Sequence, residues 1–373
     1  MSVKNKIYNT FINQFPFGEE NPVIDGIPTP ELYYTYVFPQ LAKIQASDAQ
    51  AYDYFGDSVA VSGARIVVGA YAKSSYAGAA YIFDINGNEI AKIQAFDPPG
   101  TSDAQFNDQF GYSVAVSDTR IVVSAPYEDT TASQAGSAYI FDIDGNQIAK
   151  IQASDAQASD YFGWSVAVSD TRIVVGAYGR SSYAGAAYIF DLNGNQLAMI
   201  QASDAQGGDQ FGYSVAVSDT RIVVGASYED TGGSNTGSAY IFDINGNQLA
   251  KIQASDAEAG DEFGVSVAVS NTRIVVGAYR EDTSAGSAYI FDIDGNQIAK
   301  IQASDAQIGD WFGYSVSVSD TRIVVGARLE DTTAINAGSA YIFQNVPDKK
   351  PGYNNNINNI NFNKLKYRFT GKL

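Results

Sequence analysis

The chain has 373 residues, of which 45% are hydrophobic, and it carries a formal net charge of −18 with no Cys and no His. This composition excludes disulfides, thiolate metal sites and histidine-based catalysis. No run of 18 apolar residues occurs, so we expect no membrane span, and the negative field makes nucleic acid an unfavourable partner.

Residues 1–40 are an N-terminal extension. Its start, MSVKNKIYNTFINQF, has two Lys but no apolar segment, so we expect no signal peptide. A helix is compatible with the sequence pattern only in these first fifteen residues. The localisation stays open: association with a virion or a surface is favoured, and an intracellular scaffold is the alternative.

Residues 41–343 repeat one unit six times. The Phe-Gly pair that marks each unit recurs every 49–55 residues, at Phe55, Phe110, Phe162, Phe211, Phe263 and Phe312. Each unit reads close to FGYSVAVSDTRIVVGA, then a variable stretch, then GSAYIFDINGNQIAKIQASDA. Self-similarity at such a period predicts a repeat architecture.

Four strands are predicted within each unit. SVAVS, RIVVGA, AYIFD and QIAKIQA are short runs rich in β-branched and aromatic residues. Asp-Thr joins the first two strands, and Asn-Gly or Asp-Gly joins the last two, as in tight hairpins. Four antiparallel strands per unit predict an all-β fold, the β-propeller, in which the Val face of SVAVS packs on the Ser/Ala face of a neighbouring blade.

The chain ends suggest how the propeller closes. Leu41–Ala46 reads as a fourth strand without the three that should precede it, and the last unit ends at Phe343 without its fourth strand. We therefore favour six blades closed by the N-terminal strand. Two alternatives remain: Tyr34–Phe38 adds a fifth, outer strand, or the C-terminal tail adds two strands and a seventh blade forms.

The Phe-Gly opening and the VVGAY or VVSAP close resemble the FG-GAP repeat, which builds the propeller of integrin α subunits. The resemblance covers about 300 of the 373 residues and implies a general binding or adhesion role rather than a reaction. Integrins have seven repeats, and the Pro of their motif survives here only as Pro126. The Asp-Thr turns also leave no room for the calcium loops of integrins, so those sites are not transferred.

The loops between second and third strands vary, whereas the hairpin turns are nearly identical. Variable loops on a rigid scaffold are where recognition usually sits, although free drift of these loops is the competing account. We predict a protein or glycan partner at this face. Its acidic candidates are Glu128, Asp129, Glu229, Asp230, Glu281, Asp282, Glu330 and Asp331.

A second carboxylate set lies in the loops before Phe-Gly. It includes Asp155 with Asp160, Asp204 with Asp209, and Asp305 with Asp310. For the Asp two positions before the Phe of Phe-Gly we favour a bond to nearby backbone N–H groups over metal binding. No cofactor is expected, with at most weak calcium binding in the acidic loops.

Four aromatic residues follow Phe-Gly directly and are predicted to ring the axial channel at the variable end. They are Tyr112, Trp164, Tyr213 and Tyr314. They could stack on a sugar or grip a protein loop, but packing between blades is favoured. The extended loop Ala95–Gly111 is predicted to be the main protrusion.

Residues 344–373 form an Asn-rich, basic tail with six Lys and Arg against one Asp. This tail is predicted to dock either on its own acidic propeller or on an assembly partner.

An enzyme is not expected, because the loop carboxylates repeat as near-equivalents and no acid–base pair in different environments stands out. A carboxylate-based glycosidase or other hydrolase is the alternative.

Overall fold

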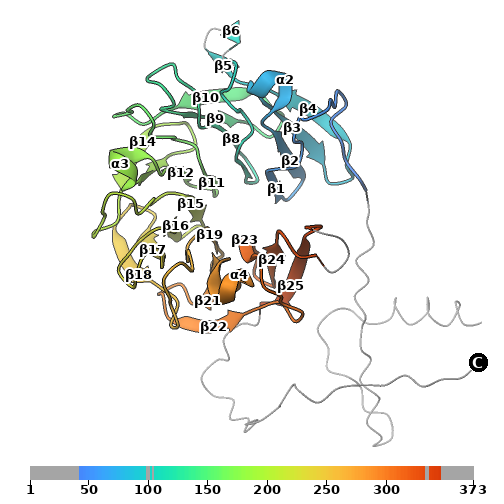
Figure 1. The fold of residues 1–373 in the computed structure, drawn as a ribbon. Coiled ribbons are helices and arrows are strands. Elements are labelled where there is room, and N and C mark those ends of the chain that lie inside the picture. Colours follow the sequence, from blue (N-terminus) through green and yellow to red (C-terminus); the bar gives the residue numbers. More distant parts are fainter. Residues whose placement is uncertain (1–41, 98–100, 103–104, 332–335, 346–373) are drawn as a thin grey trace, which may run out of the picture. The chain divides into compact units, whose positions relative to one another are not determined.

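A computed structural model describes residues 42–97, 101–102, 105–331 and 336–345. The described residues from Ile44 onward belong to one compact unit, which is built from six antiparallel sheets arranged as blades around an axis (Figure 1). Five blades have four strands and the last has three, which confirms the predicted all-β propeller with six blades. No helix in this part of the chain is long and apolar enough to span a bilayer.

The strands follow the predicted order in every blade, with the first strand innermost (Figure 1). The first strands of blades 1 to 6 are β1 (Val59–Ser62), β7 (Val114–Val116), β11 (Val166–Val168), β15 (Ser214–Val217), β19 (Ser266–Val269) and β23 (Phe312–Val318). The second strands are β2 (Arg65–Ala70), β8 (Ile121–Ala125), β12 (Ile173–Ala177), β16 (Arg221–Ala226), β20 (Ile274–Ala278) and β24 (Arg322–Ala327).

The third and fourth strands form the outer half of each blade. The third strands are β3 (Ala79–Asp84), β9 (Ser137–Phe141), β13 (Ala186–Phe190), β17 (Ser238–Asp243), β21 (Ser287–Phe291) and β25 (Ser339–Gln344). The fourth strands are β4 (Glu89–Ile93), β10 (Gln147–Ile151), β14 (Gln196–Ile200), β18 (Gln248–Ile252) and β22 (Gln297–Ile301).

The turns follow from local side-chain chemistry. In blade 4, Ser218 N–H bonds the carbonyl of Arg221 at 2.9 Å, so Asp219-Thr220 is the two-residue turn that the sequence predicts. The outer hairpin is longer than Asn-Gly alone. Asp243 closes it by accepting bonds from the backbone N–H groups of Asn245 and Asn247, both at 2.9 Å, as short polar side chains do in turns.

Three short helical turns were not predicted: α2 (Lys73–Tyr76), α3 (Arg180–Tyr183) and α4 (Glu281–Ser284). Each contains residues with positive φ, such as Ser181 at 52° and Ser182 at 59°. These left-handed residues give no apolar periodicity, so the sequence pattern could not reveal them. The long loop of blade 2 does form its own small hairpin, β5 (Phe96–Asp97) with β6 (Thr101–Ser102), which projects from the ring (Figure 1).

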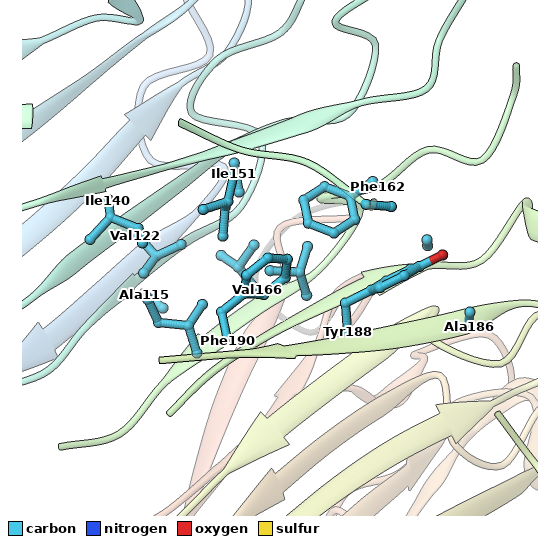
Figure 2. Packing of buried hydrophobic residues seen from close by; sticks show 14 residues of the cluster. Ala115, Val122, Ile140, Ile151, Phe162, Val166, Ala186, Tyr188 and Phe190 are labelled. Carbon is cyan, nitrogen blue, oxygen red and sulfur yellow. The ribbon is translucent and has the colours of Figure 1, made fainter. Parts of the chain in front are cut away.

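Neighbouring blades pack a large face on a small face, as predicted. Between blades 2 and 3, Ala115 of one innermost strand and Val166 of the next belong to the same buried cluster (Figure 2). On the small side, the hydroxyl oxygen of Ser113 accepts the N–H of Val166 at 3.2 Å. The alternating SVAVS sequence therefore gives each innermost strand one apolar face and one hydrogen-bonding face.

The Phe-Gly motif fixes the distance between blades. Phe110 is fully buried and meets the edges of Tyr139 and Phe141 with ring centroids 5.4 and 6.0 Å away. A Cβ on Gly111, at φ +94°, would lie 2.3 Å from the carbonyl oxygen of Ala79 in the preceding blade. Only Gly fits such a backbone contact, because no side chain can be accommodated at that distance.

The predicted closure by an N-terminal strand differs from what the structure shows. Leu41 lies outside the described residues, and Ala42–Ala46 forms no strand, so β25 has no fourth-strand partner in the described part of the chain. Ile44 and Ala46 do pack against the core of blade 1, where Ser47 bonds Glu89 at 2.8 and 2.9 Å. Ile200, Ala202 and Ser203 make the same contacts with blade 4, so this segment lies against blade 1 as the end of a fourth strand does, but without pairing with β25.

The remaining alternatives for closure fall outside the described residues. Tyr34–Phe38, the first fifteen residues and the tail strands all lie there.

The close backbone contact makes a testable prediction. Gly111→Ala should lower the free energy of unfolding by about 2 kcal/mol more than Gly260→Ala, because overpacking adds to the strain of positive φ. Gly260 has the same φ of +94° with no atom within 4 Å of an added Cβ, so it is a matched control. Equal losses in chemical denaturation would contradict the role assigned to the contact.

Candidate functional site

The variable face is formed by the loops that join second to third strands and by the loops that precede each Phe-Gly. The two sets meet between blades through the backbone. Gln210 N–H bonds the carbonyl of Tyr183 at 2.7 Å, and Phe211 N–H bonds that of Ala184 at 3.1 Å. Each blade therefore positions the variable loop of the preceding blade.

The four Glu candidates are buried rather than displayed. Glu128, Glu229, Glu281 and Glu330 each accept a hydrogen bond from the Ser that begins the third strand of their own blade, at 2.6–2.7 Å. Their relative exposure is between 1% and 8%. These four side chains stabilise the interior of their own blades, so we exclude them from the surface that could contact a partner.

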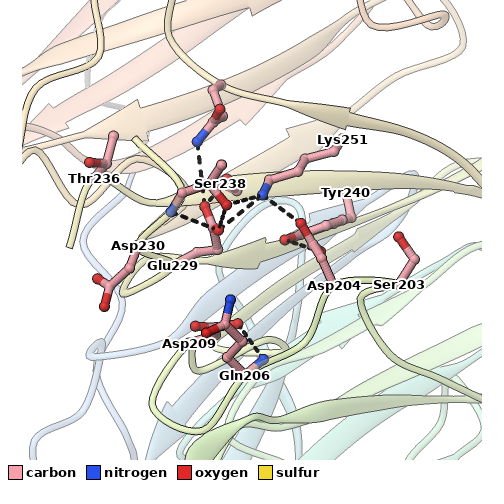
Figure 3. Close-up of polar contacts among 12 residues, drawn as sticks. Ser203, Asp204, Gln206, Asp209, Glu229, Asp230, Thr236, Ser238, Tyr240 and Lys251 are labelled. Carbon is pink, nitrogen blue, oxygen red and sulfur yellow. Dashed lines mark hydrogen bonds and ion pairs between the residues drawn. The ribbon is translucent and has the colours of Figure 1, made fainter. Parts of the chain in front are cut away.

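Glu229 shows how this interior is organised (Figure 3). Lys251 of the fourth strand lies 3.0 Å from Glu229 and 2.7 Å from Asp204, and Asp204 in turn accepts the hydroxyl of the buried Tyr240 at 2.9 Å. Burial works to raise the pKa of Glu229, but hydrogen bonds from Thr231, Ser238 and Lys251 hold it below its ordinary value. Glu229 is thus a buried charge whose ion pair and hydrogen bonds are satisfied.

In blades 1 and 3 a basic residue, Lys73 or Arg180, stands at the loop position that Glu229 holds in blade 4. In blade 3, Arg180 occupies the loop and binds Asp155 at 2.5 Å and Asp160 at 2.9 Å. The fourth strand there carries Met199 where blade 4 carries Lys251. Blades 2 to 5 each keep one such cation, which the loop supplies in blade 3 and the fourth strand supplies in blades 2, 4 and 5. Blade 1 has both, with Lys73 and Lys92 reaching the same Asp48.

The Asp before Phe-Gly has the local role that the sequence predicts. Asp209 accepts the N–H of Gln206 at 2.7 Å, and the equivalent bond recurs in blades 1 to 6. Burial raises the pKa of Asp209, and the nearby Glu229 adds to the rise. No group of three or more acidic side chains among the described residues is placed to hold a metal ion.

The four Asp candidates lie differently from their Glu neighbours. Asp129, Asp230, Asp282 and Asp331 are all exposed on the loops. They form a discontinuous acidic fringe, since each belongs to a different blade.

Three of the four aromatic candidates meet in one cluster. Trp164 lies 4.8 Å from Tyr112 and 5.7 Å from Tyr213 between ring centroids, and all three are partly exposed. Burial raises the pKa of Tyr213 to about 12. Tyr314 belongs to a second group, stacked on Trp311 at 5.8 Å with Arg328 4.9 Å above its ring. Inter-blade packing and partial exposure therefore coexist.

The sequence analysis missed Tyr178, which completes the first cluster. Its ring lies 4.6 Å from Trp164 and 5.7 Å from Tyr213. It directly follows the second strand, at the position where the resemblance places Pro and this chain has Tyr, Pro, Ser or Arg. The variation at this position is the feature of the sequence that could have identified Tyr178.

An open groove of about 640 Å³ lies between the variable loops of blades 3 and 4. It is lined by Ser182, Tyr183, Gly207, Gly208, Gln210, Tyr228, Asp230 and Asn235. Two aromatic rings, two amides and one carboxylate therefore face a shared space. Such a set can stack on a flat apolar surface and exchange hydrogen bonds with polar groups around it.

Comparison with known families agrees with the architecture. Six segments match the FG-GAP repeat: residues 38–83, 100–141, 146–190, 195–242, 247–291 and 296–343. No curated protein matches the chain. The repeat suggests a binding or structural module.

The buried ion pair predicts a pH dependence. Glu229→Gln should lower the free energy of unfolding at pH 7 by roughly 1.5–3 kcal/mol, the range for hydrogen bonds to charged groups. Because the folded pKa of Glu229 is lowered, this stabilisation is present above the unfolded pKa of about 4.3 and is lost as pH falls through the folded value. The parent and variant curves should therefore converge in acid, and a pH-independent gap would argue against the assignment.

Proposed function

Because the chain belongs to the FG-GAP repeat family, we propose that it is a non-catalytic binding module whose variable face recognises a glycan. The groove between blades 3 and 4 carries this proposal. Tyr183 is 41% exposed and Tyr228 partly exposed, so both rings can offer a face to a ligand. Sugars present apolar C–H faces that suit aromatic rings and hydroxyls that suit amide and carboxylate groups.

The groove is held by strained backbone, which favours a preformed site. Tyr183, Gln210 and Asn235 all have positive φ, at 64°, 58° and 53°. Left-handed conformations of non-Gly residues are unfavourable, and they persist when surrounding contacts enforce them. A groove that is ordered before binding loses less entropy when the ligand arrives.

A basic protein surface is the second candidate partner. The exposed aspartates of the loops favour it, because Asp129, Asp230, Asp282 and Asp331 lie on four blades of the same face. Binding of this kind would be salt-sensitive, whereas sugar stacking would be largely independent of salt. Either partner suits a surface or virion protein.

Hydrolysis is the alternative activity, and the geometry supports it less. Glycosidases use two carboxyl groups in different environments, but among the residues that line the groove only Asp230 carries a carboxyl group. The neighbouring Glu229 is committed to Ser238 and Lys251. Incubation of bound glycans with parent and Asp230→Asn protein would detect hydrolysis, and product formed only by the parent would overturn the non-catalytic proposal.

The groove residues make a binding prediction. In a glycan array followed by titration, Tyr183→Ala with Tyr228→Ala should weaken binding at least tenfold, because aromatic stacking is lost from both sides. Tyr52→Ala is the control, since Tyr52 is 83% exposed and lies outside the groove. An equal loss in the control, or no glycan bound by the parent, would reject the glycan assignment.

A further inference from the structure

Blades 1 and 6 carry the two halves of an interface that the other blade pairs complete. We call this place the seam. Val324 and Ile342 of blade 6 are 37% and 55% exposed, whereas their counterparts Val67 and Ile82 in blade 1 are fully buried under blade 2. Val59 of blade 1 is 65% exposed, against 7% for the equivalent Val114.

The glycines at the seam also lack the close backbone contacts that the equivalent glycines make between other blades. A Cβ on Gly56 would meet no atom within 4 Å, although its φ of +98° matches that of Gly111. The three atoms nearest to a Cβ on Gly326 would belong to Ser315 of its own blade, whereas one on Gly277 would lie 1.9 Å from the carbonyl oxygen of Gly313 in the next blade. The contacts that join other blades are thus absent between these described residues.

The described residues leave this seam open. The other blades touch through glycine backbones that leave no free space, as with Gly69 and Gly111, where an added Cβ would lie 2.0 Å from a carbonyl oxygen. Close-packed contacts of this kind resist the change of angle that closure would need at every interface. The exposed apolar faces therefore need another occupant.

We propose that the C-terminal tail, residues 346–373, fills the seam and covers the exposed faces of blades 1 and 6. Its position supports this. The tail begins directly after β25, the strand with the unpaired edge, and Asn345 is buried there with its N–H 3.0 Å from the carbonyl oxygen of Thr321. The 28 residues that follow are ample for the five- or six-residue strands of these blades.

The tail sequence fits an apolar seam in an acidic molecule. Residues 360–369, INFNKLKYRF, alternate apolar and polar side chains on either side of Asn363-Lys364, the pattern of strands with one buried face. The polar positions include Lys366 and Arg368, and the tail from residue 344 has six Lys and Arg against one Asp, whereas the whole chain has a net charge of −18. Attraction to the acidic loops would add to apolar burial.

Other occupants fit less well. A whole second copy docked on β25 would bring further blades into the space that blade 1 occupies. A separate partner protein would compete with a segment tethered at the seam itself, whose effective concentration is high. Both, and pairing of the N-terminal residues with β25, are outcomes that the experiment distinguishes from the tail.

The test compares two pairs of substitutions in the full chain. Val324→Asp with Ile342→Asp should lower the melting temperature by several degrees and raise hydrogen exchange in Ser339–Gln344, because a charge would enter a covered face. Leu249→Asp with Ile298→Asp is the matched control, since those residues are 52% and 47% exposed on fourth strands away from the seam. Equal behaviour of the two pairs would mean that the seam is uncovered and would overturn the proposal.

A peptide experiment identifies the occupant. A chain ending at Asn345 should bind a labelled synthetic peptide of residues 346–373, and the peptide should restore protection of Ser339–Gln344. A peptide with Phe362, Leu365, Tyr367 and Phe369 replaced by Ser keeps every charge and should bind at least tenfold more weakly. Equal binding of both peptides would indicate surface charge alone, and no binding, or a parent that is dimeric by light scattering and becomes monomeric on truncation, would also reject the tail as occupant.

Discussion

The propeller depends on one contact, the approach of a glycine backbone in one blade to a carbonyl group in the blade before it. The buried Phe of the same motif sets the orientation, and its partner Gly sets the distance, since no Cβ fits at 2.3 Å from a carbonyl oxygen. Because the backbone makes this contact, the side chains of the loops above it are free to differ. The motif therefore separates what holds the ring together from what the ring displays.

The same division explains the electrostatics of the molecule. Part of its acidity stabilises the blades, where Asp and Glu accept bonds from the hydroxyls of Tyr and Ser and pair with a Lys or Arg. Buried charges are tolerated there because each has a partner and further hydrogen bonds. Many other carboxylates stay exposed, including Asp118, Asp219 and Asp320 in the hairpin turns, so the propeller still presents a negative surface to solvent.

The blades, their strand order, the Asp-Thr turns and the loop role of the Asp before Phe-Gly could be predicted, because each depends on short-range chemistry repeated along the chain. The burial of Glu229 beside the exposed Asp230 could not, since it depends on Ser238 and Lys251 from other strands. Tyr178 was missed because its partners come from two blades. The open seam could not be predicted, because the sequence pattern shows that the faces of blades 1 and 6 are complementary but not whether the two blades are in contact.

The pairing of Arg180 with Met199 has a consequence for how such a chain changes in length. Asp155, Arg180 and Tyr188 are joined within one continuous stretch of sequence, as are Asp204, Glu229, Tyr240 and Lys251. A gene segment coding for one such stretch carries a complete set of interaction partners. Its duplication or loss by recombination would leave no orphaned charge in the neighbouring copies, so arrays with different numbers of units are accessible without compensating mutations.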